Sequence, residues 1–290
     1  MGIEEYLNGK YVASTVKIYL FEINHYLDYI GREKAETAQY KDIIQYVYFL
    51  RKQYDNPATI NRIIHALKQY YFFLIEIKKR EDHPCRNLKI KLNTTAALQL
   101  QDLLTQEQLE QLPERRERYE NLGLRNRVVM SLLLHQALRP IEIAAIKMGD
   151  INLEKGEIQI RATKKTNARI LPLKPEQIML FYNYKTEARP TLLKKKKSEY
   201  FIINQRGGRQ TKDNIHYLVS TYQDLLPGKK LTPTTIRQSV IANLLKQGKD
   251  LRIVQYFAGH KQPSATERYR QNNLEELRSA VNKYHPLDKK

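Results

Sequence analysis

The spacing of apolar residues in the first 79 positions limits most strongly how this chain folds. Apolar side chains recur at intervals of three and four in three stripes, at positions 16–27, 43–50 and 60–74, with turn signals between them. This period is typical of amphipathic helices, so the segment is predicted to form a small all-helical bundle. Ser14 and Thr59 are the expected N-cap residues of two of these helices.

The helical period is lost between residues 82 and 103, where the chain is basic and Pro84 disfavours helix just before it. A chain of 290 residues is long enough to bury two separate cores. We therefore expect a helical N-terminal domain over 1–83, a linker over 84–103 and a second domain over 104–290.

The second domain is predicted to be mainly helical with a small antiparallel sheet. Helical patterning resumes at a capping box that starts at Thr105 and returns from about residue 232 to 284. Between these helical parts, residues 156–162 and 167–173 alternate like two short strands that flank a turn, and 200–203 form another extended piece. The fold class expected for the whole chain is mainly α.

Charge and cysteine content narrow the function classes. The chain carries 50 Lys and Arg against 31 Asp and Glu, a formal net charge of +19, which favours a polyanionic partner. The single cysteine, Cys85, excludes an internal disulfide and is consistent with a reducing cytosol. The N-terminus lacks a signal-peptide pattern and no run of about 18 apolar residues occurs, so we expect a cytoplasmic protein that neither is secreted nor spans a membrane.

Three residues in the last third have side chains suited to phosphodiester chemistry. Tyr269 lies nine residues after His260 and thirty-two after Arg237. A guanidinium neutralises phosphate oxygens, an imidazole adds a hydrogen bond and a phenol supplies an oxygen nucleophile, so this set suits attack on a phosphodiester without a metal. Each residue alone is more often structural, because the chain has 20 tyrosines and most pack in cores. The joint spacing, together with a second segment upstream, favours the catalytic interpretation.

That second segment runs from 134 to 151 and includes Arg139, Glu142 and Asp150. Together with the last third, it resembles the tyrosine recombinases, the family of phage integrases, Xer proteins and Cre. The resemblance covers essentially the whole chain. It implies a helical core-binding domain of the SAM-like type, a basic linker and a catalytic domain. In this family the position of Arg139 holds the first catalytic arginine, and that of Glu142 an acidic residue that helps to place it.

The resemblance also implies roles for the other site residues. Lys164 falls on the family's β-hairpin lysine, the general acid, although Lys165 is adjacent and the assignment could shift by one. Arg237 matches the second catalytic arginine, His260 the histidine of an L-G-H motif, and Tyr269 the nucleophile. The chain departs from the family at Thr234, which replaces the histidine that accepts the tyrosine proton, and a hydroxyl cannot act as a base near neutral pH. Gln238 replaces a second, mainly structural histidine, and no metal or cofactor is implied.

The implied activity is site-specific DNA recombination. A 3′-phosphotyrosyl intermediate and a Holliday junction would form on double-stranded DNA, within a homotetramer or with a second recombinase as partner. The task would be mobile-element integration and excision, which the Thr234 departure favours weakly, or Xer-like resolution. An amphipathic helix over 273–282 would dock on a neighbouring protomer or pack on its own domain. Three alternatives stay open: a DNA-binding protein of this fold with weak or no cleavage, a type IB topoisomerase, and a general polyanion or membrane-surface binder.

Overall fold

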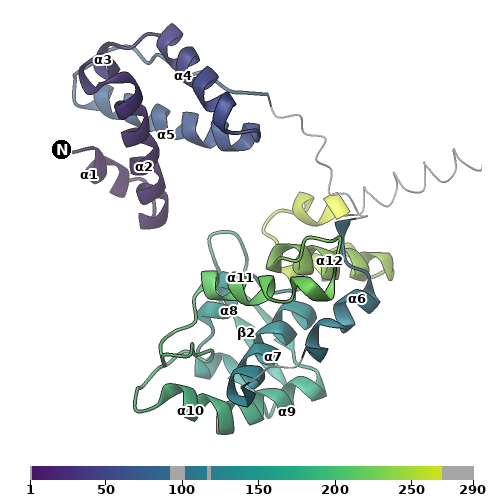
Figure 1. Cartoon of the computed structure of the whole chain (residues 1–290). Coiled ribbons are helices and arrows are strands. Elements are labelled where there is room, and N and C mark those ends of the chain that lie inside the picture. Colours follow the sequence, from purple (N-terminus) through teal and green to yellow (C-terminus); the bar gives the residue numbers. More distant parts are fainter. Residues whose placement is uncertain (1, 92–101, 116–118, 270–290) are drawn as a thin grey trace, which may run out of the picture. The chain divides into compact units, whose positions relative to one another are not determined.

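The computed structural model describes residues 2–91, 102–115 and 119–269 and divides the chain into two compact units, Met1–Thr95 and Ala96–Lys290 (Figure 1). The amphipathic segment 273–282 lies outside the described residues.

The N-terminal unit is the helical bundle that the apolar spacing predicts. Its helices are α1 (Ile3–Asn8), α2 (Ala13–Ile30), α3 (Arg32–Thr37), α4 (Tyr40–Gln53) and α5 (Pro57–Glu76). The predicted stripes face inward, and α2 packs along α5. Several tyrosines belong to this core: the buried hydroxyls of Tyr26 and Tyr71 lie 2.6 Å apart, and Tyr71 also donates to the carbonyl of Ala35. These hydrogen bonds satisfy the buried hydroxyls of Tyr26 and Tyr71.

Both predicted N-caps in this unit are wrong. Helix α5 begins at Pro57, and its N-cap is Asn56, whose side-chain oxygen accepts a hydrogen bond from the backbone nitrogen of Ala58 at 2.9 Å. Proline suits the first helical position because its ring fixes φ and its missing N–H is not needed there, so the helix starts before Thr59. Helix α2 begins at Ala13 without a side-chain cap, which leaves Ser14 inside the first turn.

Residues 84–91, the first part of the expected linker, pack on the bundle. The Cys85 side chain is fully buried, and Leu88 and Ile90 contact the same core. The side chain of Asn61 donates to the carbonyl of Ile90 at 2.8 Å and accepts from its N–H at 2.9 Å, so one amide satisfies both backbone groups. This pairing has no local sequence signal, because its partners are 29 residues apart.

The second unit is built around α7, whose residues are buried over most of its length. Its helices are α6 (Gln106–Glu110), η2 (Leu112–Glu114), α7 (Glu120–His135), α8 (Pro140–Ala145), η3 (Met148–Asp150), α9 (Pro175–Asn183), the π-helix η4 (Tyr184–Ala188), α10 (Arg189–Leu193), α11 (Lys212–Ser220), η5 (Gln223–Leu225), α12 (Pro233–Lys246), α13 (Leu251–Ala258) and a helical segment over 264–269. The predicted capping box is confirmed: Thr105 accepts from the backbone nitrogen of Gln108, and the Gln108 side chain accepts from that of Thr105.

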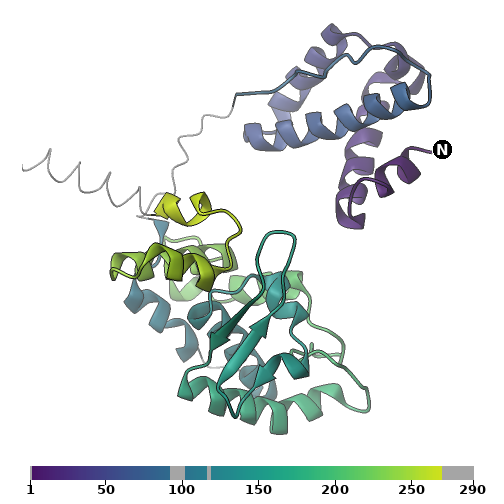
Figure 2. The ribbon, with the colours of Figure 1, turned by 180° about the vertical axis from the view of Figure 1, so that it is seen from behind.

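The sheet has three antiparallel strands in the order β1 (Ile151–Asn152), β2 (Glu157–Ile160) and β3 (Arg169–Pro172). In the register, Ile158 lies opposite Leu171 and Ile160 opposite Arg169, and these four side chains point into the unit. Figure 2 shows the long loop between β2 and β3 rising beyond the sheet. The predicted fold class is confirmed, and β1 is an addition, because a strand of two residues has no alternation to detect.

Candidate active site

The structure brings all six predicted site residues to one cavity of about 600 Å³. They come from distant parts of the second unit: Arg139 precedes α8, Lys164 lies in the β2–β3 loop, Thr234 and Arg237 are on α12, His260 follows α13 and Tyr269 is in the segment 264–269. The predicted residues therefore bring two guanidiniums, an ammonium, an imidazole, a threonine hydroxyl and a phenol to one cavity.

Arg237 is fixed by two backbone carbonyls. Its side chain is buried, and its two terminal nitrogens donate to the carbonyl oxygens of Ala137 and Ala258. Ala137 has a φ of 48°, a left-handed conformation that turns the chain between α7 and α8 just before Arg139. Burial, with the nearby charge of Arg139, lowers the pKa of Arg237 to about 10. The group is still cationic at neutral pH and is poorly solvated, so it is suited to pairing with an anion.

Arg139 lines the cavity and carries one buried donor without a partner. Its Nε is buried and has no hydrogen-bond partner among the residues that the structure describes. A buried donor without a partner costs about 1–3 kcal/mol, more when it is charged. The guanidinium of Arg139 adds to the cavity a positive charge that is suited to an anionic ligand.

His260 is buried as a neutral imidazole. Burial and the neighbouring charges of Arg237 and Arg139 lower its pKa to about 4. Its Nδ1 lies 2.8 Å from the hydroxyl oxygen of Thr266, which is itself fully buried. Near neutral pH the ring carries one proton and can donate one hydrogen bond, but it is too weak a base to hold a second proton.

Tyr269 packs its ring in a small apolar cluster with Ile241, Val254 and Ala258, between α12 and α13. Burial raises the pKa of its phenol, and the charges of Arg268 and Arg237 partly offset that effect. The phenol is therefore protonated at neutral pH, and its oxygen needs to lose a proton when it attacks.

A buried carboxylate, that of Glu142, joins the elements of the site. It accepts hydrogen bonds from Arg169 Nη1 at 2.8 Å, from the hydroxyl of Thr166 at 2.8 Å and from the backbone nitrogen of Arg139 at 2.8 Å. Burial alone would raise the pKa of Glu142, but the hydrogen bond and charge of Arg169 outweigh it and lower that pKa. Arg169 also donates from Nε to the carbonyl of Phe257 at 2.8 Å, so the pair ties the sheet to α8 and α13.

Lys164 and Lys165 are the two residues at the tip of the β2–β3 loop. The backbone nitrogen of Thr163 donates to the carbonyl of Thr166 at 2.9 Å and closes the turn around them. Both lysines are exposed and both line the cavity. The geometry brings either ammonium to the site, so the choice between them is a matter for experiment.

Other residues that the sequence did not single out also line this cavity. Lys212 and His216 lie one turn apart on the same face of α11, and Arg268 precedes Tyr269. The only signal for the first two was their spacing of four within a helical pattern, which many surface residues share. Thr234 is exposed at the start of α12, and the imidazole of His216 lines the same cavity.

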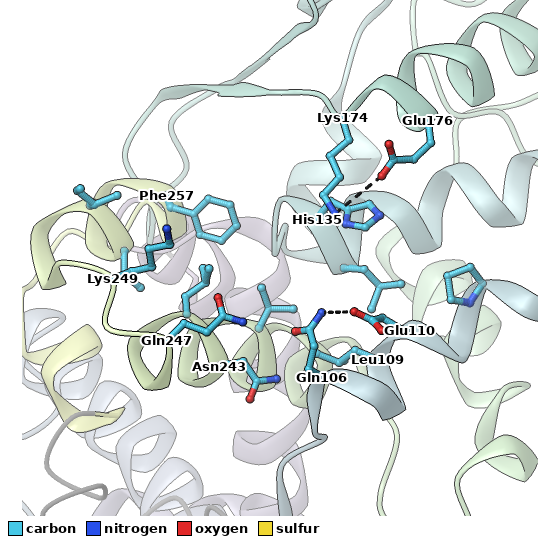
Figure 3. A pocket seen from close by; sticks show the side chains of 16 residues that line it. Gln106, Leu109, Glu110, His135, Lys174, Glu176, Asn243, Gln247, Lys249 and Phe257 are labelled. Atoms are coloured by element: carbon cyan, nitrogen blue, oxygen red, sulfur yellow. Dashed lines mark hydrogen bonds and ion pairs between the residues drawn. The ribbon is translucent and has the colours of Figure 1, made fainter.

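A second cavity, of about 700 Å³, contains none of the six predicted residues. Figure 3 shows it between α6, α12 and α13, with His135 and the Lys174–Glu176 ion pair at one side. Much of its lining is apolar, from residues such as Leu109 and Phe257. Its titratable groups form no set that could transfer a phosphoryl group, so the smaller cavity is the candidate active site.

Among the residues that the structure describes, no group of three or more His, Cys, Asp and Glu side chains is placed to hold a metal ion. No helix there is both long and apolar enough to cross a membrane.

Comparison with known proteins gives consistent results. The model of the phage integrase family matches residues 102–276. The tyrosine recombinase XerD of Listeria innocua is 28% identical over 281 residues, which cover 94% of this chain and 93% of that relative. The fold of this chain is similar to that of the XerH site-specific recombinase bound to a palindromic difH substrate (TM-score 0.72, 20% identity, 92% of this chain and 78% of that chain). It is also similar to the Tn1549 transposon integrase in complex with transposon right end DNA (TM-score 0.66, 16% identity, 98% and 99%). The resemblance inferred from the sequence is confirmed.

Proposed function

The chain belongs to the phage integrase family and is a tyrosine-type site-specific recombinase, and from this premise we propose that the cavity around Arg139 and Tyr269 is where it cuts and rejoins DNA. The observation that carries the proposal is the convergence of two guanidiniums, a neutral imidazole and a phenol on one cavity.

The proposed reaction is a transesterification. The Tyr269 oxygen attacks the scissile phosphorus, the bond from phosphorus to the 5′ oxygen breaks, and the departing 5′ oxygen takes a proton from Lys164. Arg139 and Arg237 stabilise the extra negative charge of the pentacoordinate phosphorane, and His260 donates a hydrogen bond to a non-bridging oxygen. A 5′ hydroxyl from a partner duplex reverses the step, so the energy of the phosphodiester bond is kept in the 3′-phosphotyrosyl link.

Neither Thr234, which stands at the position of the family's proton-accepting histidine, nor His260 is able to accept the proton of Tyr269. Thr234 has no basic group, and His260 is too weak a base because its pKa is about 4. Water or the phosphate itself would take the proton. We propose that the reaction runs without a strong general base. Such a base raises a rate by about 10²–10⁴-fold, so the reaction is expected to be about 10²-fold slower than with one.

The test is the capture of a covalent protein–DNA adduct. Nicked suicide duplexes from the DNA that flanks the gene are incubated with the wild type and with Tyr269→Phe, with and without EDTA, and resolved on a denaturing gel. We expect an adduct with the wild type only. An equal yield from Tyr269→Phe would overturn the assignment of the nucleophile, and loss of the adduct in EDTA would overturn the metal-independent mechanism.

The alternative function is a DNA-binding protein of the same fold with little or no cleavage, for which Thr234 is the supporting observation. Its signature is sequence-specific binding to a duplex on which no adduct forms. Thr234→His decides between the two cases, because an added imidazole restores the missing base. We expect it to raise adduct formation by about 10²-fold. Thr234→Val is the matched control, since it removes the hydroxyl without adding a base.

We further propose that the protein acts on double-stranded DNA as a homotetramer in the cytoplasm, alone or with a second recombinase. The net charge of +19 supports a polyanionic partner. The fold shared with a transposon integrase supports mobile-element integration and excision as the task, with Xer-like resolution as the other candidate. Analytical ultracentrifugation with a two-site duplex tests the tetramer, which predicts four protomers for each pair of sites.

A further inference from the structure

The turn that carries Lys164 and Lys165 is held by side-chain hydroxyls. The hydroxyl oxygen of Thr163 accepts hydrogen bonds from the backbone nitrogens of Lys165 at 3.2 Å and Thr166 at 3.0 Å. These two bonds fix the backbone of the tip itself. They leave the proton of the Thr163 hydroxyl free to be donated elsewhere.

These hydrogen bonds have a defined direction. The Thr166 hydroxyl donates its only proton to Oε1 of Glu142 at 2.8 Å. In the 2.7 Å contact between the hydroxyls of Thr163 and Thr166, Thr163 is therefore the donor. The chain of bonds runs from the backbone of the tip through both hydroxyls and ends on the carboxylate.

The same carboxylate also orders the other side of the site. Glu142 accepts from the backbone nitrogen of Arg139 at 2.8 Å, so the hairpin tip and the first arginine share one anchor. Thr166 forms a β-bridge with His260 as well, and the nitrogen of Asn167 donates to the carbonyl of Gly259 at 2.9 Å. Thr166 is fully buried, and it is the point where the exposed lysine turn meets the elements that hold Arg139 and His260.

We propose that Thr166 is a positioning residue, which holds the hairpin turn so that its lysine reaches the departing 5′ oxygen. This inference rests on the proposed function. Without the hydroxyl, the tip is attached to the site through backbone contacts only, and its lysine samples positions away from the leaving group. A misplacement of about 1 Å at a reacting group costs about 10²-fold in rate.

Replacing the leaving oxygen atom by sulfur distinguishes the protonation step from the rest of the reaction. When the leaving atom is oxygen, the departing alkoxide needs a proton. When sulfur replaces the bridging 5′ oxygen, a thiolate departs without one, because a thiol (pKa about 8.5) is far more acidic than water (about 15.7). A defect confined to the lysine therefore disappears on the sulfur substrate, whereas a defect in Arg139, His260 or Tyr269 persists.

The experiment measures the rate of adduct formation on the duplex that the wild type cleaves, with oxygen or with sulfur at the 5′ bridging position. The variants are Thr166→Val, which keeps the shape but removes the hydroxyl, and Thr166→Ser, which keeps the hydroxyl. Thr166→Val is expected to be about 10- to 100-fold slower on oxygen and within about threefold of the wild type on sulfur. Thr166→Ser is expected to match the wild type on both.

Lys164→Ala and Lys165→Ala calibrate the assay. The variant that lacks the acid is expected to be about 10²–10⁴-fold slower on oxygen and to recover on sulfur, which also identifies which lysine acts. Thr166→Val at the wild-type rate on oxygen would overturn the inference. A defect equal on both substrates would overturn it too, since it would place the role of Thr166 in packing. No adduct from the wild type on either substrate would instead count against the proposed function.

Discussion

Burial beside two guanidiniums keeps the imidazole of His260 neutral, and this has a direct consequence for its titration. Its pKa in the folded protein is lowered to about 4, whereas a free imidazole titrates near 6.5. The unfolded chain therefore binds more protons between these values, and this site makes the fold less stable as pH falls from about 6.5 towards 4. We expect an NMR titration of ¹⁵N-labelled histidines, with the His260→Gln spectrum for assignment, to give a midpoint near 4. A midpoint near 6.5 would contradict the buried site.

Glu142 is a residue whose removal should cost much more than that of a surface carboxylate. Its ion pair with Arg169 has both side chains at 0% exposure, whereas Glu199, paired with Lys147, is 59% exposed. Glu142→Ala leaves a buried guanidinium without its carboxylate and is expected to lower the free energy of unfolding by about 3–5 kcal/mol. Glu199→Ala, the control, is expected to cost less than about 1 kcal/mol. Urea denaturation compares them, and equal losses would refute a central role for Glu142.

At the scale of elements, the end of α13 places His260, and a glycine makes that end possible. Gly259 has a φ of 68°, and a Cβ built on it would lie 2.5 Å from Nη1 of Arg169. Gly248 has a similar φ of 79° but open space around it, so it is the matched control.

We expect Gly248→Ala to cost about 1–2 kcal/mol from its left-handed backbone alone. Gly259→Ala is expected to cost about 1–3 kcal/mol more, because Arg169 must move, and to reduce adduct formation. Thermal denaturation and the adduct assay measure both effects. If the two glycine variants were equally stable and active, the close packing of Arg169 against Gly259 would have no energetic role.

The helices and the hairpin could be predicted from the sequence because their signals are local. Apolar periods of three and four located α2, α4 and α5, and alternation located β2 and β3. The N-cap prediction at Thr59 failed because two local signals competed. Asn56 caps the helix and Pro57 occupies its first position, so α5 starts before Thr59. Packing of residues 84–91 on the bundle depends on Asn61, a long-range contact that periodicity does not record.

The residues of the site also differ in whether the sequence carries a local signal for them. Side chains that motifs specify, such as Arg237 and Tyr269, were named from the sequence and lie on one cavity. The network that holds them was not predicted in full. In the sequence, Arg169 looks like an ordinary polar residue of a strand and Thr166 like one of a turn. Only the fold shows that both are buried against Glu142. A buried ion pair leaves no periodic signal, so its members resemble surface charges.

For the whole molecule, the structure separates the cores into two units, and this predicts how the chain unfolds. One apolar core lies within Met1–Thr95, and the remaining core residues lie within Ala96–Lys290. We expect calorimetry of the full chain to resolve two transitions, each reproduced by the corresponding fragment, because each unit buries its own apolar surface. A single transition absent from both fragments would show that the units depend on each other for stability.

The identity of the amino acid joined to DNA decides whether Tyr269 is the nucleophile. The wild-type adduct is digested with trypsin and nuclease, and the modified peptide is sequenced by mass spectrometry. The account predicts a nucleotide attached through its 3′ phosphate to Tyr269, which the structure places in the cavity with Arg139, Arg237 and His260. Attachment to another of the 20 tyrosines, or through a 5′ phosphate, would contradict it.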